Sequence, residues 1–365
     1  MMGQAKRRLL LCSGLLACSG LLACSGRYVS NSSDEDGAAA ASAMGGTSSA
    51  EAGAGPQMAS DTACGAPIGQ PTAIDAPIVS GMTWWLRLSR LIWGAEGHAA
   101  PEISSPLSYQ QAGELADAAI DQALAETRGI PGAGLFVRNW LQVEEVSTPL
   151  LADWNGALSN GAAIDALLTL PFDSTRLGAF SEPAFLTAYE SISWRGAVLS
   201  EALFALSVPR EPASVVHSVA PPGVTRRDGL SQAVAAPICT SCHRVIDPLG
   251  WSLENYDRYG KFVRLDAGQP VDASGTYRLP KSGGEVQFAN FDDLGSRLTR
   301  TCDANLGLAD GFLSFALEQS QLASPLSDAD LETERARIEQ AFMRSGRTYR
   351  SLIKAFAQGS AIRSN

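Results

Sequence analysis

Residues 108–129 read SYQQAGELADAAIDQALAETRG. Ser108 and Gln111 have the spacing of a capping box, in which two side chains satisfy backbone N–H groups at the start of a helix. Apolar residues then recur every three or four positions, and Gly129 ends the run. This stretch therefore predicts a helix with one buried face.

The chain after residue 83 repeats this periodicity, and only short stretches resemble strands. Further helices are predicted at residues 84–92, 135–143, 162–170, 182–204, 294–300, 305–318, 327–343 and 348–358. Strands are predicted at residues 261–265, 270–279 and 285–288, each bounded by Gly, Pro or Asp. The predicted fold class is mainly α, with a helical N-terminal part and a helical C-terminal part that carries a small β-hairpin.

Composition excludes two broad classes of protein. The 365 residues are 45% apolar and 18% charged, which supports a packed core and excludes disorder of the whole chain. Acidic residues outnumber basic ones by 38 to 28, giving a net charge of −10, and the first eight residues hold the only cluster of Lys and Arg. Nucleic acid is therefore excluded as a main partner.

The N-terminus has the pattern of an export signal. Three basic residues precede an apolar stretch at 9–23, which is too short to span a bilayer comfortably. Its six-residue repeat places Leu-Leu-Ala-Cys before both Cys18 and Cys24, and each copy resembles a bacterial lipobox. We expect residues 1–24 to be a lipoprotein signal peptide, with Cys24 or Cys18 anchoring the protein at the cell envelope, facing the periplasm or on the outer membrane. The alternative is a repeat inside an ordinary secretory signal.

Composition shifts indicate the domain organisation. Residues 25–80 are rich in Gly, Ala and Ser without periodicity, as expected of a flexible tether. Prolines at 209, 212, 221 and 222 mark a seam further along. We expect folded parts at 81–208, 209–290 and 291–365.

The sharpest chemical signal is the pentapeptide Cys239-Thr-Ser-Cys242-His243. Random placement of the chain's cysteines and histidines would give roughly 0.001 copies of it. Two thiols at this spacing can add to the two vinyl groups of one haem, and the adjacent imidazole can ligate the iron. Pro248, or the residue before it, is expected to offer a backbone carbonyl to that imidazole.

The sequence leaves the opposite axial ligand and two other uses of the motif open. Met343 and His217 are the candidates for the distal iron ligand, His98 is the remaining histidine, and a five-coordinate iron is a further option. The motif would alternatively form a Cys239–Cys242 disulfide, or a zinc site with Cys302 and a histidine. Cys302 also fits the role of a small buried apolar residue.

The residues after the motif carry a family resemblance. Residues 246–260 read IDPLGWSLENYDRYG, and residues 271–275 read VDASG. With the motif, they resemble a family of exported bacterial proteins called planctomycete-type cytochrome-like proteins, which carry domains of unknown function 1592, 1588 and 1585. The resemblance covers about residues 195–360, and the 1592-like part at 81–208 is degenerate. Family members tend to have a histidine shortly before the first cysteine, where this chain has Gln232 and Ala233.

The resemblance implies a cytochrome-like C-terminal part, 1588-like at 209–290 and 1585-like at 291–365. Together with the motif it predicts a lipoprotein that binds one haem c and transfers electrons, more a redox protein than a catalyst, with the membrane and a basic redox protein as partners. The rival is a haem-free envelope interaction or structural lipoprotein with a disulfide or zinc at the motif. Residues 247–248 and 272–275 are expected to be turns, and Glu254, Asn255 and Asp257 structural supports.

Overall fold

The computed structural model describes residues 79–94, 97–103, 107–173, 176–208, 223–321 and 326–363. The predicted signal peptide, the lipidation candidates Cys18 and Cys24, the tether and His217 lie outside the described residues. The fold is mainly α, as predicted. None of the described helices combines the length and apolar character needed to cross a bilayer.

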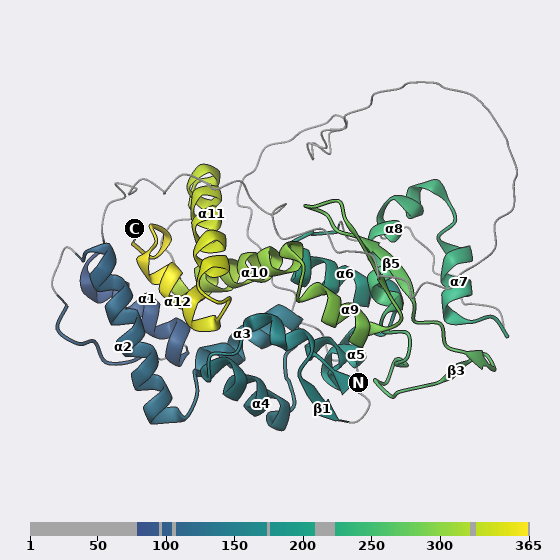
Figure 1. Cartoon of the computed structure of the whole chain (residues 1–365), viewed down its shortest axis with the longest axis horizontal. Coiled ribbons are helices and arrows are strands. Elements are labelled where there is room, and N and C mark those ends of the chain that lie inside the picture. The colour runs from purple at the N-terminus through teal and green to yellow at the C-terminus, as the bar shows by residue number, and fades with distance from the viewer. Residues whose placement is uncertain are drawn as a thin grey trace, which may run out of the picture. The chain divides into compact units, whose positions relative to one another are not determined.

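The elements follow in chain order (Figure 1). The helices are α1 (Gly81–Trp93), α2 (Tyr109–Thr127), α3 (Pro131–Leu141), α4 (Thr148–Ser159), α5 (Pro183–Ala188), α6 (Ile192–Phe204), α7 (Arg226–Ala233), α8 (Pro237–Trp251), α9 (Phe291–Leu298), α10 (Cys302–Ser320), α11 (Asp328–Arg344) and α12 (Tyr349–Gln358). The 3-10 turns are η2 (Ile164–Leu168), η3 (Ala179–Ser181) and η4 (Ala361–Arg363). The strands pair as antiparallel two-stranded sheets: β1 (Pro171–Asp173) with β2 (Arg176–Leu177), β3 (Leu265–Asp266) with β4 (Gln269–Pro270), and β5 (Gly275–Arg278) with β6 (Glu285–Phe288).

The predicted helices match where capping and periodicity agree. Ser108 and Gln111 form the predicted capping box of α2. The predicted helix at 182–204 is divided into α5 and α6, because Ser191 caps a new helix by accepting a hydrogen bond from the backbone of Trp194. Residues 162–170 form only the short turn η2. The sequence did not predict α4, α7 or α8.

Helices from all three predicted folded parts share one hydrophobic core. The indole of Trp84 in α1 donates to the carbonyl of Ala357 in α12, and that of Trp140 in α3 donates to Ala202 in α6. Phe136 and Tyr349, from α3 and α12, pack with ring centres 5.6 Å apart. These buried contacts tie the first and last helices into a single packing unit.

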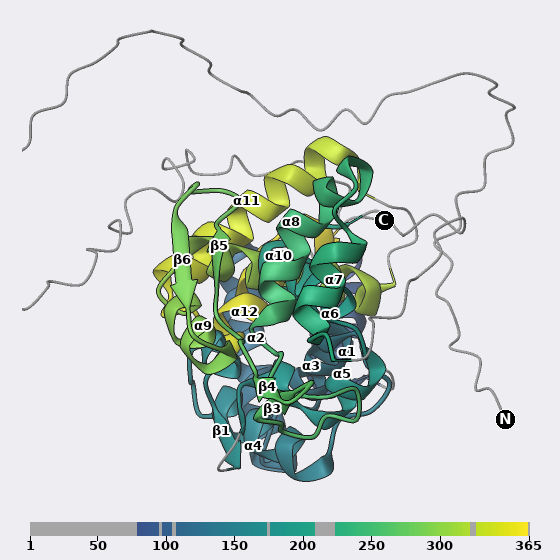
Figure 2. The same cartoon turned by 90° about the vertical axis from the view of Figure 1, so that its right-hand side faces the viewer.

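Two glycines let α6 and α8 cross with their backbones in contact (Figure 2). A Cβ atom on Gly196 in α6 would lie 1.9 Å from the carbonyl oxygen of Ile246, and one on Gly250 in α8 would lie 2.1 Å from that of Ile192. Real Cβ atoms do not approach backbone so closely, so both positions require glycine. The pairing is reciprocal, which fixes the register of the two helices.

We expect Gly250→Ala to destabilise the protein by about 1–3 kcal/mol, because the added methyl group forces α6 and α8 apart. Gly156→Ala in α4 is the matched control. A Cβ there meets no atom within 4 Å, so alanine should be neutral or stabilising. Urea unfolding of both variants measures the difference. Equal stabilities would show that the crossing tolerates a side chain.

Candidate functional site

The motif lies on the first turns of helix α8, with Pro237 at the helix start. Cys239 and Cys242 are one turn apart, so their side chains share a helix face. Both are partly exposed free thiols, so the structure does not contain the alternative Cys239–Cys242 disulfide. The two sulfurs are therefore available for covalent chemistry at the surface.

Helix α8 changes environment along its length. Its N-terminal residues up to Val245 are exposed or half-buried wherever the structure describes their side chains, whereas residues 246–250 are buried. Pro248 lies inside the helix and not in the predicted turn. It has no N–H to offer the carbonyl of Arg244, which is the usual cause of a bent helix. The motif therefore sits on the half of α8 that extends from the core.

His243 is held by a buried carboxylate on the same helix. Its Nδ1 atom lies 3.0 Å from both carboxylate oxygens of Asp247, one turn further along α8. Ser193 of α6 donates to Asp247 Oδ1 at 2.8 Å, and its hydroxyl is 3.3 Å from His243 Nδ1. The predicted partner, a backbone carbonyl at Pro248, is wrong: the Asp247 side chain takes that role.

This arrangement leaves the other ring nitrogen of His243 available. With Nδ1 donating its hydrogen to Asp247, Nε2 keeps a lone pair for a metal. The structure shows no hydrogen bond from Nε2 to any of the residues it describes. Burial raises the pKa of Asp247, and the hydrogen bonds from Ser193 and His243 oppose that rise. The His243 side chain is 25% exposed and that of Asp247 5%, so the imidazole spans core and surface.

Met343, the candidate distal ligand that the structure describes, does not lie on an element that packs against the motif half of α8. Met343 lies on α11 and packs against the core, next to α10 and α12. The ring of His98 stacks on Trp93 at 4.4 Å and pairs with Glu126 at 3.3 Å. His217 lies outside the described residues. In the described part of the chain, His243 therefore has no partner imidazole or thioether.

Cys302 does not join the motif. It is disulfide-bonded, so it offers no thiolate to a zinc ion, and it lies among the buried apolar residues, as the other prediction has it. Its partner is neither Cys239 nor Cys242, since both are free. The part of the chain that the structure describes also contains no group of three or more His, Cys, Asp or Glu side chains able to hold a metal ion. The zinc alternative thus loses its third ligand.

The segment after α8 is organised by Arg195, a fully buried residue of α6. Its guanidinium donates to five backbone carbonyls, those of Leu186, Tyr189, Leu253, Tyr256 and Asp257. Burial lowers the pKa of Arg195 to about 10, with a further contribution from the charge of Arg226. The Asp257 carboxylate accepts from the backbone of Tyr259 and Lys261, which confirms its role as a structural support.

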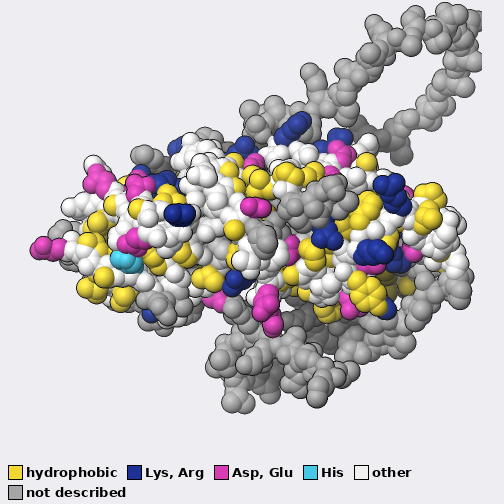
Figure 3. Space-filling model, turned by 90° about the horizontal axis from the view of Figure 1, so that it is seen from below, with side chains coloured by type: hydrophobic (Ala, Val, Ile, Leu, Met, Phe, Trp, Pro, Cys, Tyr) yellow, Lys and Arg dark blue, Asp and Glu magenta, His cyan; other side chains and the backbone are white. Residues whose placement is uncertain are grey.

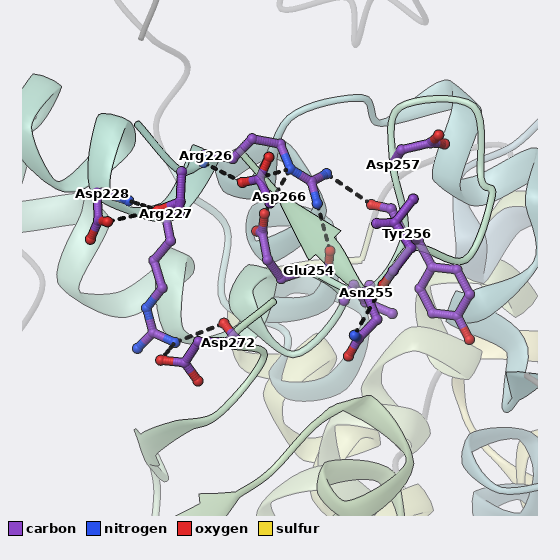
Figure 4. Close-up of polar contacts among 12 residues, drawn as sticks. Arg226, Arg227, Asp228, Glu254, Asn255, Tyr256, Asp257, Asp266 and Asp272 are labelled. Atoms are coloured by element: carbon purple, nitrogen blue, oxygen red, sulfur yellow. Dashed lines mark hydrogen bonds and ion pairs between the residues drawn. The ribbon is translucent and has the colours of Figure 1, made fainter. Parts of the chain in front are cut away.

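A second polar cluster lies beyond the end of α8 (Figure 4). The Glu254 carboxylate is only 2% exposed, and Arg226 of α7 contacts it at 2.9 Å while also reaching Asp266 at 3.5 Å. Arg226 further donates to the carbonyls of Glu254 and Tyr256. Asp272 accepts from the backbone and hydroxyl of Ser274, so the predicted turn there is confirmed. Sequence reasoning missed Arg226 and Asp266, which no local pattern links to Glu254.

Glu254 should make stability fall as pH rises. Burial raises the pKa of Glu254 from its usual 4.5 to about 7, and the negative charge of Asp266 adds to the rise. The positive charges of the three arginines nearby oppose the rise, with that of Arg226 the largest. The folded protein thus holds this proton more tightly than the unfolded chain. The contribution of this bound proton to the free energy of unfolding is fully present below pH 4.5 and is lost as pH rises through 7. The total loss is roughly 3 kcal/mol.

Urea unfolding at pH 5 and pH 8 measures this difference. Glu254→Gln should remove this decrease in the free energy of unfolding between pH 5 and pH 8. The same change at the exposed Glu285 of β6 should leave the decrease as it is in the wild type. Parallel profiles for wild type and Glu254→Gln would contradict the raised pKa.

Comparison with known sequences agrees with part of this picture. Residues 176–266, about a quarter of the chain, match the family described as PSCyt3, a protein of unknown function (DUF1588). The match runs from β2 to β3, so it includes α6, α8 and the motif, and it begins before the expected boundary at 209. No curated protein and no solved structure matches the chain. The matched segment is thus similar to the 1588 part of the cytochrome-like family.

Proposed function

We propose that this chain is an exported, lipid-anchored protein of the cell envelope that holds one haem c and transfers electrons. Cys239 and Cys242 would form the thioether bonds, and His243 would ligate the iron through Nε2. Cys24 or Cys18 would carry the lipid. When bound, the haem supplies one-electron redox chemistry at its iron.

One observation carries the proposal: two free thiols and a pre-oriented imidazole stand together on the exposed half of α8. Covalent attachment requires reduced, accessible sulfurs, which both cysteines provide. Iron ligation requires a ring nitrogen with a free lone pair, which Asp247 secures at Nε2 by holding Nδ1. The donor set therefore fits a haem attached at the surface.

Electron transfer is favoured over catalysis by the exposure of the site. A haem bound to the outer half of α8 would present an edge to a partner protein, and Trp194, 59% exposed, lies next to the Ser193 that contacts His243. The net charge of −10 suits a basic redox partner. The face shown in Figure 3 mixes acidic, basic and apolar side chains among the described residues.

Haem attachment is tested by expressing the chain with a cytochrome c maturation system. After denaturation, the protein should retain a haem spectrum and the mass of one haem. Cys239→Ser and Cys242→Ser should each reduce covalent haem strongly, whereas Ser241→Ala, between the two cysteines, should not. A colourless product with both thiols free or joined in a disulfide would overturn the proposal and favour the haem-free lipoprotein.

Asp247 should set the electronic properties of the site. A carboxylate bonded to the ligating imidazole makes that ligand a stronger electron donor and stabilises the oxidised iron. We expect Asp247→Asn to raise the reduction potential, and Ser193→Ala to raise it less because the carboxylate remains. Potentiometric titration of the haem-loaded variants measures the shift. An unchanged potential in Asp247→Asn would show that the carboxylate only supports the fold.

A further inference from the structure

Cys302 begins helix α10 at a junction of several segments. The next residue, Asp303, accepts hydrogen bonds from the backbone N–H groups of Lys281 and Ser282, in the turn between β5 and β6. Arg347, between α11 and α12, donates to the backbone just after α9. A covalent bond at Cys302 therefore braces a point where four parts of the fold meet.

The disulfide of Cys302 connects this junction to the part of the chain before residue 79. Cys302 is bonded, whereas the motif cysteines Cys239 and Cys242 are free. The sequence contains seven cysteines in all. The partner is therefore one of the four others, which all lie outside the described residues: Cys12, Cys18, Cys24 and Cys64.

Processing of the N-terminus separates these four candidates, and here the inference rests on the export and lipid attachment of the proposed function. Cleavage before the lipidated cysteine removes Cys12, and the lipid occupies the sulfur of the anchor. With the anchor at Cys24, Cys64 alone keeps a thiol. With the anchor at Cys18, Cys24 also keeps one.

Chain length favours Cys64 over Cys24 in that second case. Cys24 precedes the first described residue, Val79, by 79 − 24 = 55 residues, whereas Cys64 precedes it by 79 − 64 = 15 residues. The effective concentration of a tethered group falls with roughly the −3/2 power of linker length, so Cys64 has an advantage of about sevenfold. Both routes of processing therefore select Cys64.

Cys302 and the motif cysteines differ in their access to solvent. Cys302 is 9% exposed, while Cys239 and Cys242 are partly exposed on the outer half of α8. Exchange requires a thiolate to reach a disulfide sulfur, so a buried disulfide resists reductants that keep exposed thiols reduced. One chain can thus hold a disulfide together with the two free thiols that haem attachment requires.

We propose that Cys302 forms a structural disulfide with Cys64, which fastens the tether to the start of α10 and resists reduction in the folded protein. The new bond joins the two sulfurs. The two thiols give up two electrons and two protons to a protein disulfide of the oxidising compartment, which becomes a dithiol. The folded part is then joined to its lipid anchor through α10 as well as through α1.

Peptide mapping of the full-length, exported protein tests this bond. Free thiols are alkylated in denaturant, and the protein is digested with trypsin without reduction. Cleavage after Lys and Arg places Cys64 alone in residues 28–87 and Cys302 alone in residues 301–335, with both motif cysteines in 228–244. We expect 28–87 to be cross-linked to 301–335 and released by reduction. Alkylated Cys302, or a cross-link from it to any other peptide, overturns the proposal.

Cys64→Ser should expose Cys302 to alkylation in denaturant and lower the melting temperature by at least about 4 °C, because the unfolded chain gains entropy without the cross-link. Thr62→Ala, two residues away, is the matched control and should change neither. Cys302→Ser should melt like Cys64→Ser, and the double variant no lower. A wild-type melting temperature in Cys64→Ser would contradict a structural role for the bond.

Dithiothreitol added to the folded wild type tests the resistance to reduction. At a concentration that keeps the motif cysteines reduced, the cross-link of Cys302 should remain, and its loss would contradict the shielded position. The same digest reports haem on residues 228–244 and lipid on the N-terminal peptide. Missing haem or lipid contradicts the proposed function, whereas a missing cross-link contradicts the disulfide, so the two failures are distinguished.

Discussion

The close crossing of α6 and α8 is the constraint on which the motif site depends. Side chains three apart share a helix face, so Ser193 lies on the side of α6 that Gly196 opens, and Asp247 lies on the side of α8 that Gly250 opens. Because both glycines bring backbone onto backbone, the Ser193 hydroxyl reaches Asp247 and His243 together. A wider crossing would leave a buried carboxylate with one donor fewer. The close packing of α6 against α8 therefore also fixes the orientation of the His243 imidazole.

The same crossing explains how several buried polar groups are tolerated. Arg195 is one position from Gly196 and enters the core, where its five carbonyl partners compensate for the loss of water. Asp247 is compensated by Ser193 and His243. Glu254 is the exception, since its Oε2 atom has no donor among the described residues and burial raises its pKa despite the charge of Arg226.

The sequence predicted what depends on local pattern and missed what depends on distance. The α2 capping box and the fold class followed from spacing alone, as did the motif. Helix α8 was missed because Pro248 and the polar residues of its first turns read as a loop, and only a helix that continues through Pro248 brings Asp247 one turn from His243. The contact of Arg226 with Glu254 joins segments 28 residues apart and follows from no periodicity. The disulfide of Cys302 gave no local signal either.

The two halves of helix α8 therefore lie in different environments, one at the surface and one in the core. Its outer half offers thiols and an imidazole nitrogen to the surface, where the proposed electron transfer would require a short path to a partner. Its inner half is fixed by Gly250 against α6, and its last residue, Trp251, stacks against the guanidinium of Arg227 in α7. The motif site requires the Ser193–Asp247 contact, whereas the cluster around Glu254 requires α7 and the β3–β4 hairpin. The two clusters do not share these supporting contacts, so each can be lost while the other is kept.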